Sequence, residues 1–210
     1  MTGYSAIRNL LAAVVVSGLV LACASQAKTT RNLLDPAYAD VEFSNFLVVA
    51  AGANYDARAQ FERQLVAAIR NSGRSAAAYY TIAGNNSQIT RADIGKAIAE
   101  GGFDAVLLTR VKGQENTVDV VSGAPETKTT RRSGTAFDLF RYDYEELNDP
   151  DTVEINTSVL VVTELYAAGD EKKVWAIESS ASSKDGAGVL IDMQVETIIR
   201  HLRKDKLIGG

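Results

Sequence analysis

The sequence predicts a single α/β domain with three layers and a mixed sheet, which takes on α+β character toward its C-terminal end. Short apolar runs alternate with helical patterns between residues 46 and 111, a strand–turn–strand pattern lies between 155 and 182, and an amphipathic helix closes the chain. The 210 residues are enough to bury a substantial core in one domain. The expected order is therefore β-α-β-α-β, then a β-hairpin, then a helix.

The first β-α unit begins with the apolar run of residues 46–51, which Gly52 ends. A continuous run of this kind is typical of a strand that is buried on both faces. A helix is expected over residues 56–72, with Asn54 as its N-terminal cap and Gly73 as its C-terminal stop. Its inward face carries apolar side chains at four-residue spacing, namely Phe61, Leu65 and Ile69.

The second unit joins a short strand over residues 76–82 to a helix that Thr90 caps, with Asp93 in the position of a capping box. A Gly-Gly pair at 101–102 ends this helix, and the apolar run 103–111 predicts a third strand. Two successive β-α units favour parallel pairing of the three strands through right-handed crossovers.

The C-terminal part predicts an antiparallel hairpin followed by a helix. A long strand over residues 155–167 and another over 173–182 flank a turn at 168–170. The closing helix is expected over residues 188–206, because its apolar side chains form one stripe, namely Ile191, Val195, Ile198 and Leu202.

A long polar insertion, residues 113–150, separates the third strand from the hairpin. Val118 and Val120 alternate with polar neighbours, as do Tyr142 and Tyr144, so pairing within parts of the insertion stays open. Connections of this length are uncommon in compact domains and are often functional when they are ordered.

Residues 122–150 begin basic and become acidic, and aromatic side chains lie between the two blocks of charge. Arginine together with aromatic residues is enriched in protein–protein interfaces, so one interpretation is a partner-binding segment. A disordered loop, or an edge hairpin whose aromatic side chains pack on the sheet, is the simpler interpretation. The candidate partner-binding residues are Arg131, Arg132, Phe140, Tyr142 and Tyr144.

The N-terminus has the order of a secretory signal: a short stretch with Arg8, an apolar run from Leu10 to Ala22, and then Cys23, the only cysteine of the chain. A membrane-spanning helix is disfavoured, because the run is shorter than the ~20 residues that a bilayer requires. The block Val20-Leu21-Ala22-Cys23 resembles the lipobox of bacterial lipoproteins, which implies cleavage before Cys23 and acylation of its thiol. Plain secretion without a lipid is the alternative.

The expected organisation is a signal peptide at residues 1–22, a lipidated cysteine with a tether at 23–40, and a periplasmic domain at 41–210 that contains the insertion. The tether is predicted because its residues lack periodicity and include Pro36. The aspartate that retains lipoproteins at the inner membrane is missing after Cys23. The lipoprotein resemblance therefore implies the periplasmic face of the outer membrane of a Gram-negative bacterium.

Composition and motifs disfavour several classes of function. The formal net charge of −4 argues against nucleic acid as a partner. His201, the only histidine, is expected to be a solvated surface residue without a partner for general base catalysis. One cysteine and one histidine cannot form the usual zinc site, and the acidic residues between 138 and 154 lack the spacing of an EF-hand loop. We therefore expect no enzyme activity, no cofactor and no metal.

Several blocks of the chain resemble a group of small, mostly uncharacterised outer-membrane lipoproteins. The order of elements is also similar to the three-layer domain of the LpoB penicillin-binding-protein activator, the CsgG secretion lipoprotein and the N-terminal domain of TolB. This resemblance implies binding or assembly rather than a reaction. The blocks are residues 63–73, 103–110, 164–166 and 173–175, and the closing helix with Leu207 and Ile208.

The expected function is that of a non-enzymatic outer-membrane lipoprotein. Its lipid anchors it, and its periplasmic domain binds or scaffolds another envelope protein, or its own copies. An oligomeric accessory subunit of a secretion or transport assembly is the alternative. A third interpretation is a cell-wall hydrolase that acts through carboxylates such as Glu145 and Glu154.

Overall fold

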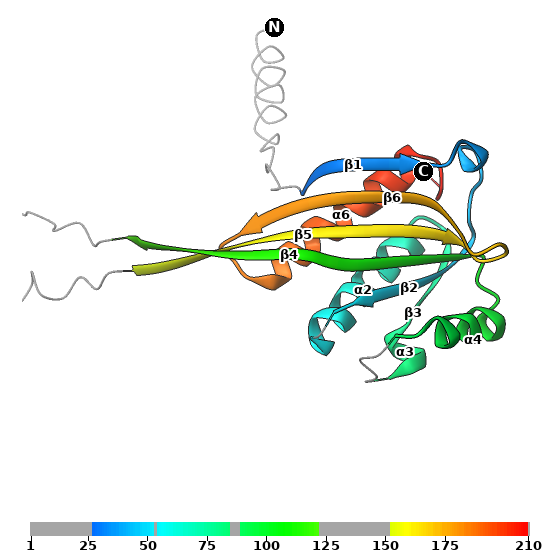
Figure 1. The fold of residues 1–210 in the computed structure, drawn as a ribbon, viewed down its shortest axis with the longest axis horizontal. Coiled ribbons are helices and arrows are strands. Elements are labelled where there is room, and N and C mark those ends of the chain that lie inside the picture. The colour runs from blue at the N-terminus through cyan, green and yellow to red at the C-terminus, as the bar shows by residue number, and fades with distance from the viewer. Residues whose placement is uncertain (1–26, 53, 85–88, 122–151, 210) are drawn as a thin grey trace, which may run out of the picture.

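The protein is described by a computed structural model in which residues 27–52, 54–84, 89–121 and 152–209 are placed. These residues form a six-stranded sheet in the order β1-β6-β5-β4-β2-β3 with five helical segments (Figure 1). The strands are β1 (Lys28–Leu34), β2 (Asn45–Ala51), β3 (Ser75–Ala78), β4 (Ala105–Val121), β5 (Thr152–Ala167) and β6 (Lys172–Ser183). The helices are η2 (Pro36–Tyr38), α2 (Tyr55–Arg70), α3 (Tyr80–Ala83), α4 (Arg91–Gly101) and α6 (Ala187–Lys204).

The mixed sheet confirms the predicted α/β class. β2 pairs in parallel with both β3 and β4, as the two successive β-α units predict. All the other pairs are antiparallel, including the predicted hairpin of β5 and β6. The parallel half comes from the β-α units and the antiparallel half from the hairpin, which explains the α+β character of the C-terminal part.

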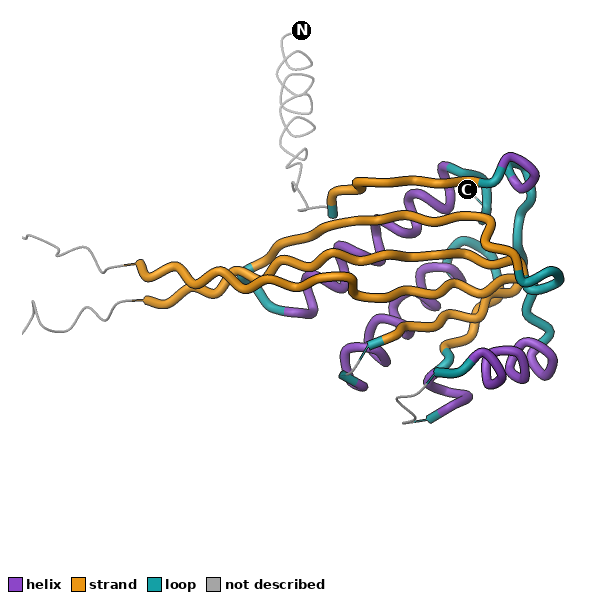
Figure 2. Tube along the Cα trace, viewed as in Figure 1, coloured by secondary structure: helices purple, strands orange, loops and turns teal. Residues whose placement is uncertain are grey.

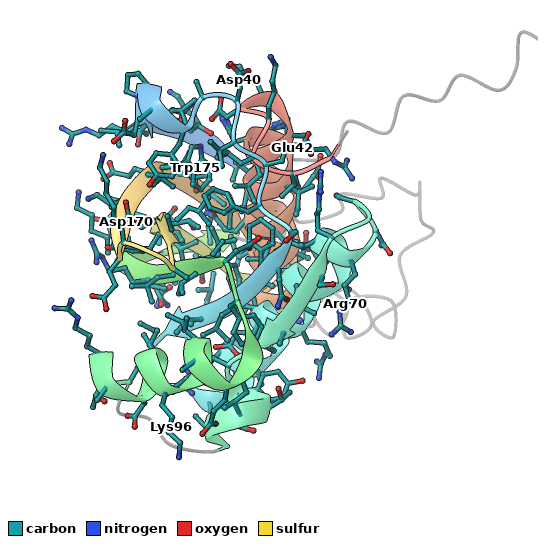
Figure 3. All side chains as sticks on the ribbon, turned by 90° about the vertical axis from the view of Figure 1, so that its right-hand side faces the viewer. Asp40, Glu42, Arg70, Lys96, Asp170 and Trp175 are labelled. Atoms are coloured by element: carbon teal, nitrogen blue, oxygen red, sulfur yellow. The ribbon has the colours of Figure 1, made fainter. Side chains whose placement is uncertain are left out.

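Helices cover both faces of the sheet around β2. Phe46 and Val48 of β2 belong to the larger core, to which α2 and α6 contribute Leu65 and Ile198. The residue between them, Leu47, points to the other face, where a smaller cluster includes α3 and α4. The alternation of side chains along a strand therefore divides the apolar run between two cores. Figure 3, turned by 90°, shows α2 and α6 together on one side and α4 apart from them.

The predicted helix ends are correct to within about two residues. Asn54 caps α2 by accepting a hydrogen bond from the amide of Ala57, and Thr90 caps α4 by accepting one from Asp93. Gly102 ends α4 in the left-handed conformation, with φ of 61°, which glycine adopts without strain. The strand predicted over 76–82 is shorter, because the chain turns into α3 directly after β3 ends at Ala78.

The prediction of a tether at residues 23–40 is wrong from residue 27 onward. Residues 28–34 form β1, which pairs antiparallel with β6 from Lys28 opposite Ser180 to Leu34 opposite Trp175. Ala27 is buried, and its carbonyl accepts a hydrogen bond from Thr197. β1 lies at the edge of the sheet with mostly exposed side chains, so backbone pairing holds it without the apolar alternation that would have revealed a strand.

The third strand is longer than its predicted range of 103–111, and part of the insertion 113–150 pairs, which the alternation at Val118 and Val120 left open. β4 continues through a bulge between Val111 and Gly113 to Val121, and β5 begins at Thr152. The side chains of this part are exposed where they are described, so polarity does not prevent pairing. Residues 122–151 lie outside the described part of the chain.

The closing helix and the hairpin build the core as predicted. Trp175 of β6 is fully buried and is labelled in Figure 3. Its indole Nε1 donates a 2.7 Å hydrogen bond to Oδ2 of Asp205 at the end of α6. Ile177 shares its face, as expected from the alternation along β6. This bond ties the C-terminal end of α6 to the sheet.

Candidate functional site

The residues that the sequence predicts to be functional lie outside the described residues. They are Cys23, Arg131, Arg132, Phe140, Tyr142 and Tyr144, and their roles stay predictions. The structure does fix where the long segment between the strands is attached. Val121 pairs with Thr152, so the two ends of segment 122–151 leave from adjacent positions. The segment that contains the candidate binding residues is therefore attached at the outer end of the β4–β5 strand pair.

We call this strand pair the ribbon, defined as residues 112–121 of β4 and 152–159 of β5. β2 ends opposite Arg110, and β6 ends opposite Thr157. Among the described strands, the outer part of the ribbon thus has no third partner. Figures 1 and 2 show β4 and β5 continuing beyond the end of β6 and beyond α6.

The ribbon exposes an apolar pair. Val118 lies directly opposite Ile155, and the two side chains are 59% and 53% exposed. Val111, at the bulge where the ribbon begins, is 55% exposed. Nearer the sheet, Ser158 and Ser182 share a 2.7 Å hydrogen bond between their hydroxyl oxygens. Large exposed aliphatic side chains on a two-stranded extension are typical of a surface that contacts another molecule.

A cavity of about 470 Å³ lies at the base of the ribbon, between the sheet and the first turns of α2 and α6. We call it the ribbon-base cavity. Its walls are mainly apolar, and Gln114 and Thr157 of the ribbon form part of its rim. The apolar lining residues include Phe61, Val159, Val161, Leu190 and Ile191.

Three of the polar residues that line this cavity come from its two helices, and the strands contribute Thr109, Arg110, Gln114 and Thr157. Gln194 of α6 is 2% exposed, and its Oε1 accepts a 2.6 Å hydrogen bond from Oγ of Ser179. Arg58 of α2 is 4% exposed and lies with its guanidinium carbon 5.9 Å from the centre of the Tyr55 ring. Asn54 supplies the third group at the start of α2.

Glu62 lies one helical turn after Arg58 and is fully buried. One carboxylate oxygen accepts the amide of Ala50 at 2.8 Å, and the other accepts the amide of Tyr80 at 2.7 Å. Burial raises the pKa of Glu62, while these hydrogen bonds and the charge of Arg58 act in the opposite direction. β3 ends at Ala78, so it does not reach the amide of Ala50. The carboxylate of Glu62 accepts this amide in place of a strand partner.

Sequence reasoning missed Arg58 and Glu62 as special positions. They occur on the face of α2 that also carries Leu65 and Ile69, with spacings of four and three residues. A charged pair within an apolar helical face is the signal that could have identified them. Gln194 gives no comparable signal, because a single amide on a helix is usually solvated.

The opposite face of the sheet carries ion pairs. Glu164 is buried, and its two oxygens lie 3.1 Å from nitrogens of Arg110 and Lys173. Glu178 lies 2.8 Å from Lys112, and this hydrogen bond lowers the pKa of Glu178. Each described carboxylate here is matched by a cation, which favours a role in stabilising the sheet.

His201 differs from its predicted surface position. It is partly buried, and its Nε2 lies 2.9 Å from Oγ1 of Thr29 on β1. Burial, and next the charge of Arg200, lower the pKa of His201.

Within the described ranges, no cluster of three or more His, Cys, Asp or Glu residues could hold a metal ion. No helix of the described part of the chain is long and apolar enough to cross a bilayer.

A second cavity, of about 510 Å³, lies between α4 and the face of the sheet that carries Leu108 and Tyr166. Its lining includes Ile94 and Ile98 of α4. Burial raises the pKa of Tyr166, whose hydroxyl donates a hydrogen bond to Glu164 at 3.2 Å. That hydroxyl is thus already bonded, and the charged lining residues Arg91 and Glu171 form an ion pair with each other.

The chain matches no family model and no curated protein. The solved structures similar to it include a PelC dodecamer from Paraburkholderia phytofirmans, with 13% identity over 88% of this chain and 100% of that chain, at a TM-score of 0.48. Lipoprotein GNA1162 from Neisseria meningitidis is 15% identical over 77% of this chain and 99% of its own, at a TM-score of 0.41.

A minor lipoprotein from Acinetobacter baumannii is 10% identical over 80% of this chain and 97% of its own, at a TM-score of 0.36. Structures similar to this chain therefore include bacterial lipoproteins. Because these TM-scores lie below 0.5, no functional residue is transferred from them.

Proposed function

We propose that this protein is a non-enzymatic, lipid-anchored envelope protein of the outer membrane whose ribbon binds another envelope protein. The single observation that carries the proposal is the strand pair that extends beyond β6 and ends at segment 122–151. That segment, which is attached at the outer end of the strand pair, holds the predicted Arg and aromatic residues.

The ribbon offers two means of contact. From Lys112 onward, β4 has β5 as its one neighbour among the described strands, which leaves a free edge of backbone amides and carbonyls. A free strand edge accepts an added strand from a partner by main-chain hydrogen bonds. The exposed pair of Val118 and Ile155 adds apolar area for a partner's side chains.

The position of β1 supports tethering at a surface. Ala27 is fixed in the folded domain, and four residue steps separate it from Cys23, which span at most ~14 Å. Lys28 lies opposite Ser180, near the end of β6 from which the ribbon extends. A lipid on Cys23 would thus hold the ribbon end of the domain close to the membrane and raise its effective concentration for partners there.

Self-association is the second candidate function, as an oligomeric accessory subunit of a secretion or transport assembly. The observation that favours it is the same apolar pair on a free-edged ribbon, because two such ribbons can pair with each other. The hydrolase interpretation has less support. Glu154, in the outer part of the ribbon, forms an ion pair with Lys184, and Glu145 lies outside the described residues.

Photo-crosslinking in cells tests the proposal. A crosslinking residue at Val118 is compared with one at Ala99, which is exposed on α4 at a distance from the ribbon. We expect one defined envelope protein to be captured at Val118 and not at Ala99. Capture of the chain itself at Val118 would favour the second candidate, and no product at Val118 would contradict both.

Membrane fractionation tests the anchor separately. With Cys23→Ala, we expect loss of palmitate labelling and loss of the protein from the outer-membrane fraction. Retention of the variant in that fraction would contradict anchoring through Cys23.

A further inference from the structure

The ribbon-base cavity has the size and lining of a small-molecule site. Its volume of about 470 Å³ lies within the range of ~300–1,000 Å³ that is usual for such sites. Its walls come from two layers of the fold, since the sheet (β2, β4 and β5) forms one wall and α2 and α6 form the other. The mainly apolar lining fits the aliphatic part of a ligand.

Gln194 supplies a polar group without a partner. Its Oε1 is bonded to Ser179, while its Nε2 is buried and has no hydrogen-bond partner among the described residues. A buried donor that stays unpaired costs about 1–3 kcal/mol. An acceptor atom of a ligand in the cavity would satisfy this donor.

The surroundings of Gln194 favour a negatively charged acceptor. α2 and α6, of 16 and 18 residues, both begin at the cavity, where Asn54, Ala57 and Ala187 contribute to the lining. No side chain caps α6, and Ala187, its first residue, lines the cavity. The N-termini of α2 and α6 favour negative charge, as does the cation of Arg58, whose charge also acts on the buried Glu62. None of the described lining residues is acidic.

We propose that the ribbon-base cavity binds a small amphipathic carboxylate, that is, an aliphatic chain that ends in one carboxylate group. The carboxylate accepts from Nε2 of Gln194 and lies near Arg58 and the start of α6, and the chain lies against Phe61 and Leu190. The proposal does not depend on docking by the ribbon. The carboxylate ligand is thus proposed in addition to the protein partner of the ribbon.

Calorimetric titration with decanoate tests this site. The protein is the chain from residue 23 onward with Cys23→Ser, which lacks the predicted signal peptide and lipid. We expect saturable binding of one decanoate per chain, and at least tenfold weaker binding of decanol, which has the same aliphatic chain without the charge.

Three variants locate the binding. Gln194→Glu keeps an acceptor for Ser179 but replaces the free donor by a like charge, so we expect at least tenfold weaker binding of decanoate. Ala57→Phe fills the cavity from α2 without changing its polar groups, and we expect the same loss. Ala99→Phe adds the same ring on the exposed side of α4 and is expected to bind decanoate like the unchanged chain.

The site would be refuted by an absence of saturable decanoate binding, or by unchanged binding in Ala57→Phe. Equal affinity for decanol and decanoate would refute the charged head group. If Gln194→Glu fails to fold, the comparison of Ala57→Phe with Ala99→Phe decides the location alone.

Discussion

Oγ1 of Thr29 lies 2.9 Å from Nε2 of His201, and this hydrogen bond joins the first strand of the sheet to its last helix. The two residues are far apart in sequence, at the two ends of the folded domain. The bond shows that β1 belongs to the packed structure and not to a tether.

A chain that begins at residue 41 is therefore expected to be less stable than one that begins at residue 27. The shorter chain loses the pairing of β1 with β6 and the burial of Ala27, and backbone hydrogen bonds contribute about 0.5–1.5 kcal/mol each. We expect the free energy of unfolding in urea to fall by ~2 kcal/mol or more. Equal unfolding midpoints for the two chains would show that β1 adds nothing to stability.

Stability is expected to decrease in mild acid because of His201. Burial lowers the pKa of its imidazole below the usual 6.5, so the unfolded chain binds the proton more tightly than the folded chain. The contribution of the neutral His201 imidazole to the free energy of unfolding is fully present above pH 6.5. It is lost as the pH falls through the lowered pKa of His201 in the folded state. The measurement is the urea midpoint as a function of pH.

His201→Gln removes the titrating group and serves as the comparison. We expect a smaller decrease of the midpoint below pH 6.5 in this variant than in the unchanged chain. The interpretation fails if both proteins lose stability equally with acid.

Glu62→Gln is expected to destabilise the fold by about 1–3 kcal/mol, although it removes a buried charge. The two oxygens of Glu62 each accept a backbone amide, and glutamine would present an NH₂ group to one of these donors. The measurement is the free energy of unfolding in urea. Glu100→Gln on the exposed side of α4 is the matched control, with an expected change below ~0.5 kcal/mol.

Asp205→Ala is expected to cost about 1–3 kcal/mol, because it leaves the indole N–H of Trp175 buried without its partner. Trp175 is the only tryptophan of the chain, so its fluorescence reports directly on this region. We expect a lower unfolding midpoint and a changed emission spectrum of the folded protein. Asp192→Ala, at an exposed position of α6, should leave both unchanged.

The parts of the fold that could be predicted from the amino-acid sequence are those in which one residue pattern has one physical meaning. The apolar run of β2 predicted a strand buried on both faces, and the cap residues Asn54 and Thr90 marked the starts of α2 and α4. The four-residue spacing along α2 and the stripe of α6 predicted their inward faces. These signals are local, because each depends on the periodicity or capping of a single element.

The tertiary structure decided the elements and sites that depend on distant partners. β1 and the ribbon are strands because β6 and β5 supply their hydrogen bonds. In the sequence, β1 shows no apolar alternation, and the ribbon shows only the short alternation at Val118 and Val120. Glu62 accepts the amide of Ala50 because β3 ends before it reaches that residue. The ribbon-base cavity forms where the first turns of α2 and α6 lie against the sheet. Such arrangements arise from packing between segments that are remote in sequence, so local patterns do not reveal them.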